Sequence, residues 1–214
     1  MTTINDIDQT CPVCGKQSSQ RVLMSTNSFG YSDLDFRPPS MQRETMSLWL
    51  MECPECGYVE WMMRGDGASI PISYLKSDEY IGCEGHDFKK HLSEKFYRRY
   101  MIQRELNDIK KCFSNLLHCA WSCDDSEDEN ADEIRKMALS YIDDIVPEDV
   151  EEERYYLMVK ADLLRRTSQF DKLINEFSDV VIGEDDLDAG LRFQLEKARE
   201  KDTACYTFED VYED

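Results

Sequence analysis

Two pairs of cysteines near the start of the chain have the spacing of metal ligands. The first motif reads Cys11-Pro12-Val13-Cys14-Gly15, and the second reads Cys53-Pro54-Glu55-Cys56-Gly57. Two residues between cysteines let both thiolates reach one tetrahedral ion from a tight turn, and the glycine that follows permits the positive φ of such a turn. The two copies predict a zinc site with the ligands Cys11, Cys14, Cys53 and Cys56.

Four thiolates would complete the coordination of this zinc. A catalytic zinc keeps one position open for water or substrate, whereas a structural zinc is closed by four protein ligands. The predicted site is therefore structural. Because a module of this size has a small core, zinc binding would supply much of its folding free energy.

Other cysteines and histidines offer less complete ligand sets. Cys83 and His86 have ligand spacing, and His91 lies five residues beyond His86. With one more ligand they would form a second zinc site. The alternative is a solvent-exposed linker between two modules, which we prefer because the ligand set is incomplete. Cys119 and Cys123 are one helical turn apart and have the spacing to share a metal. We interpret Cys112 and Cys119 instead as small, buried packing residues.

Three carboxylates lie between the two cysteine motifs, at Asp33, Asp35 and Glu44. Paired carboxylates serve as general acid and base or bind a hard cation, but they also cap turns. We favour the turns, because the sequence shows no phosphate-binding glycine loop, serine elbow or His-Glu-x-x-His pattern.

The elements that must position these residues change type along the chain. Runs rich in β-forming residues at 21–24, 48–51 and 58–62 predict strands, which would pair as a zinc ribbon within residues 1–82. From residue 88 the apolar spacing becomes helical. It predicts an α+β protein, with an all-α domain over residues 83–214 whose helices lie at 88–105, 108–123, 131–146, 151–166, 170–182 and 187–201.

Six helices joined by short links predict stacked helical hairpins. Two segments share one spacing, at positions 107, 109, 112, 116 and 119 and at positions 168, 170, 173, 177 and 180. This spacing resembles the second helix of a tetratricopeptide repeat, although Leu173 stands where that family has alanine. We expect tetratricopeptide-like packing rather than a regular array.

The net charge of −20 is unevenly distributed. Residues 1–100 carry 14 acidic and 11 basic side chains, and residues 101–214 carry 31 and 14. Such an acidic chain repels phosphate backbones and anionic lipids. The sequence has no apolar run long enough to span a bilayer and no signal-like N-terminus. We therefore expect a cytoplasmic protein with reduced cysteines that binds neither nucleic acid nor membrane.

Several of these stretches together resemble an uncharacterised bacterial family. They are the two Cys-Pro-x-Cys-Gly motifs, the segment Asp33-Leu34-Asp35-Phe36-Arg37-Pro38 between them, and Leu116-Leu117-His118-Cys119-Ala120-Trp121-Ser122-Cys123-Asp124-Asp125. Members of that family pair an N-terminal zinc ribbon with a tetratricopeptide-like helical tail. The resemblance implies this architecture and no particular activity.

Three functions from different classes remain open. The first is a non-enzymatic, zinc-binding adaptor that binds another protein through its helical tail. The second is a nucleic-acid-associated zinc-ribbon regulator, which would need a basic cluster on the ribbon. The third is an enzyme with a site between ribbon and helices that uses Asp33 and Asp35. We rank them in this order.

Overall fold

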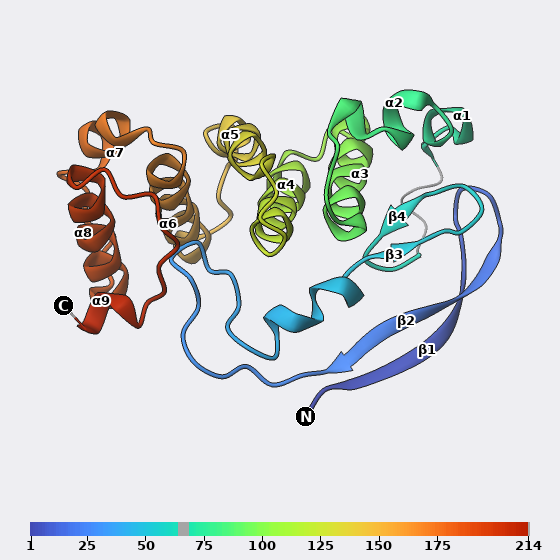
Figure 1. Ribbon diagram of the computed structural model, residues 1–214, viewed down its shortest axis with the longest axis horizontal. Coiled ribbons are helices and arrows are strands. Elements are labelled where there is room, and N and C mark those ends of the chain that lie inside the picture. Colours follow the sequence, from blue (N-terminus) through green and yellow to red (C-terminus); the bar gives the residue numbers. More distant parts are fainter. Residues whose placement is uncertain (64–68, 214) are drawn as a thin grey trace. The chain divides into compact units, whose positions relative to one another are not determined.

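The computed structural model describes residues 1–63 and 69–213, and its contacts divide the chain into two compact units (Figure 1). The first unit consists of Met1–Asn27 and Met41–Ile134, and the second of Ser28–Ser40 and the chain from Arg135 onward. Strands lie near the N-terminus and helices dominate the C-terminal part, as expected of an α+β protein. None of the helices in the described ranges is long and apolar enough to cross a membrane.

The first unit begins with two β-hairpins that form separate two-stranded sheets. Strand β1 (Thr3–Thr10) pairs antiparallel with β2 (Gln17–Ser25), and β3 (Met51–Glu52) pairs antiparallel with β4 (Val59–Glu60). A 3₁₀ helix, η1 (Arg43–Leu48), precedes β3 and packs on β2. The turn of each hairpin contains one cysteine motif, so the chain direction reverses at each ligand pair.

Helices complete the first unit. Two short helices, α1 (Ile72–Leu75) and α2 (Asp78–Ile81), and the 3₁₀ turn η3 (Cys83–Gly85) lead into a long antiparallel pair. This pair consists of α3 (His91–Glu105) and α4 (Ile109–Asp124). Its buried apolar side chains include Phe96, Ile102, Phe113, Leu116 and Ala120. The burial of these side chains provides most of the driving force for the pairing.

The second unit is helical. Its core helix α6 (Val150–Arg166) packs on both α7 (Phe170–Phe177) and α8 (Asp185–Arg199), which also pack on each other. The short helix α9 (Asp210–Glu213) packs on α8. Helix α5 (Ala131–Ile142) begins at the end of the first unit and continues into the second.

The segment Ser28–Ser40 belongs to the second unit although it lies between the cysteine motifs in sequence. Gly190 on α8 makes room for Met158 and Phe208, because a Cβ at this position would lie 3.0 Å and 3.2 Å from their side chains, whereas Leu34 of this segment would lie at an ordinary contact distance of 3.8 Å. Leu34 is fully buried, and its amide donates to the carbonyl of Tyr206. A small residue on the helix therefore lets two distant segments pack closely.

The two segments with matched spacing form the same kind of helix ending. After α3, Asn107 has a φ of 56°, and the amide of Asp108 donates to the carbonyl of Gln103. After α6, Ser168 has a φ of 60°, and the amide of Gln169 donates to the carbonyl of Leu164. Both endings place a left-handed residue and a six-to-one hydrogen bond where the chain turns into the next helix.

The predicted elements agree with the structure in type with one exception, and they differ at their ends. The strand predicted at 21–24 lies within β2, and the strand predicted at 58–62 is shorter, as β4. The strand predicted at 48–51 is wrong except at Met51, because Leu48 ends η1 and β3 begins only at Met51. All six predicted helices are present, but α5 ends at Ile142 rather than at residue 146, and α7 ends at Phe177 rather than at residue 182. The predicted division at residue 82 stays a prediction, whereas the contacts group α3 and α4 with the ribbon.

Candidate metal centre

The two cysteine turns have the same backbone geometry. In the first turn the amide of Cys11 donates to the carbonyl of Lys16, and the amide of Gly15 donates to the carbonyl of Cys11, both at 2.9 Å. The second turn repeats both bonds at 2.9 Å, from Cys53 to Tyr58 and from Gly57 to Cys53. Gly15 and Gly57 have φ values of 74° and 72°, as the sequence predicted for the residue after each pair.

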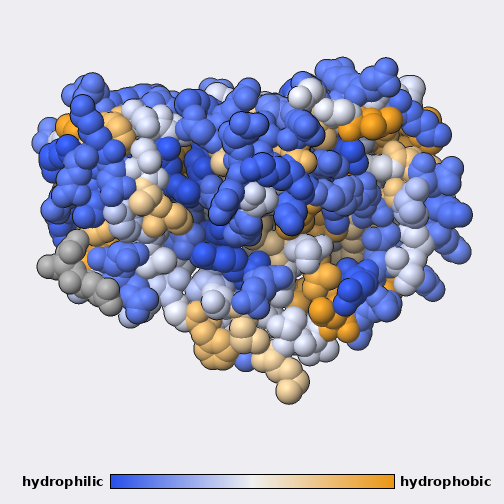
Figure 2. All heavy atoms as spheres, in the orientation of Figure 1, coloured by the Kyte–Doolittle hydropathy of each residue, from blue (hydrophilic) through white to orange (hydrophobic). Residues whose placement is uncertain are grey.

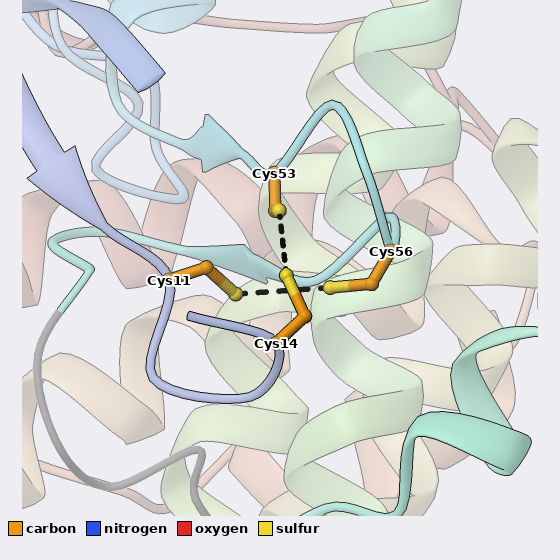
Figure 3. A group of neighbouring side chains, drawn as sticks. All are labelled: Cys11, Cys14, Cys53 and Cys56. Atoms are coloured by element: carbon orange, nitrogen blue, oxygen red, sulfur yellow. Dashed lines mark hydrogen bonds between the residues drawn. The ribbon is translucent and has the colours of Figure 1, made fainter. Parts of the chain in front are cut away.

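The four sulfurs point toward a common centre from these two turns (Figure 3). The Sγ atoms of Cys11 and Cys56 are 3.7 Å apart, those of Cys14 and Cys53 are 3.5 Å apart, and all four lie within 4.8 Å of one another. A tetrahedral zinc with Zn–S bonds of about 2.3 Å separates its sulfurs by roughly 3.8 Å. The arrangement is therefore compatible with zinc, and all nine cysteines of the chain are free of disulfides.

A cation bound at this centre would have to displace protons from the thiols. Burial raises the pKa of Cys11 and Cys56, because a thiolate there loses its hydration. Burial acts in the same direction on Cys14, but hydrogen bonds from the backbone of Lys16 and the side chain of Cys53 outweigh it and lower the pKa. A divalent cation at the centre would stabilise the thiolate form of all four side chains and release their protons.

Known proteins offer no relative with which this site can be compared. Neither the family models and curated sequences nor the solved structures include a match to this chain. The chemistry of the site itself supports metal binding: it has four soft sulfur donors, three of them buried, in two turns of the same geometry. Among residues 1–63 and 69–213, this is the one group of three or more metal-ligating side chains.

A buried ion pair holds the second hairpin against α3. Arg99 on α3 lies 2.6 Å from the carboxylate of Glu60 on β4, and the two side chains are 2% and 12% exposed. The same carboxylate accepts a hydrogen bond from the hydroxyl of Tyr58 at 3.2 Å and one from the amide of Trp61 at 2.9 Å. The guanidinium also meets the side-chain amide of Gln103. Both charges are thus compensated where water is excluded.

Further basic residues of α3 contact the strand before the second cysteine turn. Glu52 lies 2.7 Å from Nε2 of His91 and 3.4 Å from Nη1 of Arg98. Lys95 donates its ammonium to the backbone carbonyl of Leu50. Three successive turns of α3 therefore contact β3 and its approach, which orients Cys53 from outside the metal site.

The second predicted ligand set does not assemble. Cys83 is buried in η3, where burial raises its pKa to about 11. The ring of His86 packs against Phe88 and Tyr97, with centroids 5.5 and 4.8 Å away. His91 instead lies between Glu52 and Glu94 on the surface. These three residues serve packing and ion pairing, and the solvent-exposed linker that we preferred is wrong for Cys83, which is buried inside the first unit.

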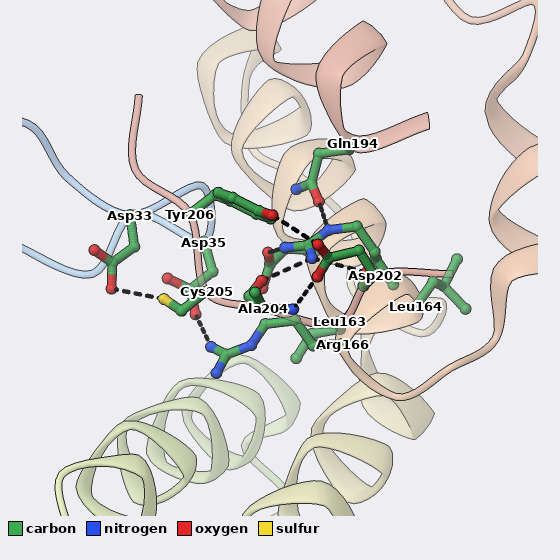
Figure 4. A network of polar contacts seen from close by, with 12 residues as sticks. Asp33, Asp35, Leu163, Leu164, Arg166, Gln194, Asp202, Ala204, Cys205 and Tyr206 are labelled. Carbon is green, nitrogen blue, oxygen red and sulfur yellow. Dashed lines mark hydrogen bonds and ion pairs between the residues drawn. The ribbon is translucent and has the colours of Figure 1, made fainter. Parts of the chain in front are cut away.

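Asp33 and Asp35 lie in a buried polar network of the second unit (Figure 4). They are 2% and 1% exposed. The Sγ of Cys205 is 3.5 Å from Asp33, Arg166 lies 4.0 Å from Asp35, and the amide of Arg37 donates to Asp35 at 3.2 Å. The turn predicted for Asp35 is present, and both carboxylates face protein groups rather than water.

Two groups of residues near the metal site escaped the sequence reasoning. One is the basic face of α3, whose members recur at helical spacing at 91, 95 and 98. The other is an aromatic cluster in which Trp49 stacks on Trp61, with centroids 5.8 Å apart, and His118 meets both rings edge-on. Trp49 and Trp61 flank the second cysteine motif at similar distances in sequence, which was the one local signal for this cluster.

Proposed function

We propose that this chain is a zinc-binding, non-enzymatic adaptor of the cytoplasm. Its metal stabilises the ribbon, and its tetratricopeptide-like tail binds a protein with basic and apolar side chains. The observation that carries the zinc assignment is the set of four sulfurs held by two identical turns. Because four thiolates close the coordination of zinc, this centre has no position for a reacting water, which favours a structural role.

The binding half of the proposal is supported by exposed valines in the second unit. Val146 and Val181 are 79% and 80% exposed, and Val150 is 58% exposed. Arg154, one turn after Val150, donates to the carbonyls of Ile182 and Gly183, so the loops before α6 and before α8 lie together. Exposed apolar side chains that gather on one face are typical of interaction sites.

Acidic side chains surround these valines. The loops and first helical turns that carry them include Asp144, Glu148, Asp149, Glu151 and Glu184. Hydrophilic side chains also cover most of the face of the molecule seen in Figure 2. A partner that places lysine or arginine around an apolar anchor would match both the charge and the hydropathy of this surface.

Nucleic acid is a poorer match than protein. Binding to phosphate depends on lysine and arginine that are free to displace counterions. On α3, the richest basic segment near the ribbon, Arg98 and Arg99 pair with carboxylates of the ribbon and Lys95 with its backbone. These cations are engaged in holding the fold.

The test combines metal analysis with quantitative co-purification from the native host. We compare the wild-type chain with V146S/V181S and with the control M24S, which changes an exposed apolar residue of the first unit. We expect one zinc per chain in all three, and a partner that is retained by M24S and lost by V146S/V181S. The complex should also weaken with added salt. A partner retained equally by all three variants would refute the tail surface, and a zinc-free chain would refute the metal site.

A further inference from the structure

A cavity of about 470 Å³ opens in the first unit beside the aromatic cluster. Residues of β2, η1 and β3 line it, together with residues just after β4 and on α4. The lining includes Trp49, Trp61, Met51, Met62, Gln42 and His118. Its volume falls within the range of roughly 300–1,000 Å³ that is usual for small-molecule sites. None of the four cysteines of the metal site is among the described residues that line this cavity.

The aromatic wall of the cavity is held in place before any ligand arrives. The indole Nε1 of Trp49 donates to Oγ1 of Thr45 at 3.0 Å, and that hydroxyl donates to the carbonyl of Gln42 at 2.6 Å. Trp61 stacks on Trp49 with an interplanar angle of 23°. Trp61 nevertheless remains 42% exposed, so a large aromatic face is presented to solvent. A fixed aromatic surface reduces the entropy lost on binding.

The described residues that line the cavity carry no formal charge. All nine of them are apolar, aromatic or neutral polar, in a chain whose net charge is −20. Burial lowers the pKa of His118 to about 3, so its imidazole is neutral at cellular pH. Its Nδ1 is buried and has no hydrogen-bond partner among the described residues. Such a wall offers nothing to a phosphate or carboxylate and favours an uncharged ligand.

We propose that this cavity binds an uncharged, planar aromatic small molecule. Its ring would stack against Trp49 and Trp61, with the flexible thioethers of Met51 and Met62 closing around it. The Gln42 amide and the His118 imidazole are the polar groups that would orient a ring nitrogen or hydroxyl. This site is separate from the tail surface and does not depend on the partner proposed for it.

The methionines provide a direct test. In the full-length chain labelled with ¹³C-methyl methionine, Met51 and Met62 report on the cavity, and Met137 and Met158 of the second unit serve as references. Indole is the probe, indole-3-acetate the charged comparator and cyclohexanol the non-aromatic one. We expect indole to shift Met51 and Met62 saturably, with a dissociation constant in the millimolar range or tighter, as is usual for so small a ligand.

Two variants separate binding from folding. W61A removes the exposed ring and should weaken indole binding by about tenfold or more. F29A removes a comparably exposed aromatic side chain of the second unit and should leave binding unchanged. Zinc content and the reference methionine signals, measured on the same samples, show whether W61A is folded. The proposal is overturned if indole leaves Met51 and Met62 unshifted, if W61A is folded and binds equally, or if cyclohexanol or indole-3-acetate binds as tightly as indole.

Discussion

The buried pair between Arg99 and Glu60 allows a quantitative test of how α3 holds the ribbon. In R99M the carboxylate of Glu60 stays buried and keeps its bonds from Tyr58 and Trp61, but it loses its countercharge at 2.6 Å. Removing one member of a buried pair destabilises a protein by about 3–5 kcal/mol, because the remaining charge has neither water nor a countercharge. We expect a loss in that range for the first unit.

The matched control is Lys111, which pairs with Asp108 at 2.9 Å on the surface, with side chains 52% and 33% exposed. Exposed pairs contribute about 0–1 kcal/mol. K111M should therefore cost less than about 0.5 kcal/mol, since Asp108 still caps α4 through the amide of Lys111. The contrast between the two variants isolates burial, because each removes one cation at a similar distance from a carboxylate.

The assay is urea unfolding followed by tryptophan fluorescence at a fixed excess of zinc. All three tryptophans belong to the first unit, so the signal reports that unit alone. The double variant R99M/E60Q removes both charges and leaves an oxygen to accept from Tyr58. It should be more stable than R99M by at least about 1 kcal/mol. The reasoning fails if R99M costs no more than K111M, or if the second substitution adds further loss.

Four further predictions follow from individual residues. C53S should lose its zinc and expose the first hairpin to amide exchange, whereas C205S should keep one zinc in native mass spectrometry. C112A should retain full zinc, since burial keeps this thiol protonated with a pKa of about 12. Its free energy of unfolding, measured by thermal unfolding, should fall by only about 1 kcal/mol. A lost metal equivalent would identify Cys112 as a ligand.

At His91, burial alone would lower the pKa, but the hydrogen bonds that the imidazole donates to Glu94 and Glu52 outweigh burial and raise the pKa. The extra stability is therefore fully present below the unfolded pKa near 6.5 and is lost as pH rises through the folded pKa. The midpoint of urea unfolding of the wild type should exceed that of H91Q by more at pH 6 than at pH 8.5. Equal differences at both values would contradict this. Finally, fluorescence anisotropy with DNA or RNA at about 150 mM salt should show no binding tighter than about 1 μM.

The parts of the site that depend on local spacing could be predicted from the sequence. Each cysteine turn is encoded within six residues, and both turns have the predicted form. The matched spacing around residues 107 and 168 likewise marks two helix endings of the same geometry. In each case the structure depends on a few neighbouring residues, so a short stretch of sequence contains all the residues that determine it.

Other features had no local signal. Strand β1 contains few apolar residues and is largely exposed. Its backbone pairing with β2, and not burial of its side chains, holds it in place, so an alternating hydrophobic pattern does not reveal it. Two of the side chains that contact Asp33 and Asp35, those of Cys205 and Arg166, lie more than 130 positions away in the sequence. Contacts of this kind depend on how helices pack, which a single sequence window does not contain.

The arrangement of the hairpins explains why losing the metal should affect one of them far more than the other. The hairpins form separate sheets, so no backbone ladder in the described residues joins β1–β2 to β3–β4. The second hairpin is held to α3 by the buried pair at Glu60 and by the contacts of Glu52. The first is joined to it by a hydrogen bond from Gln20 to the carbonyl of Glu52 and by packing of β2 on β3 and η1.

Zinc would add a direct link between the hairpins, because it takes two ligands from each. Without zinc, the β1–β2 hairpin retains few buried side chains, with Val22 its one buried apolar residue. A two-stranded hairpin of this kind is marginal in water by itself. In C53S, amides of β1 and β2 should therefore exchange rapidly while those of β4 and α3 stay protected. Uniform loss of protection across all four elements would show instead that the metal supports the whole unit, and that the contacts of α3 with Glu60 and Glu52 are not sufficient to hold the second hairpin.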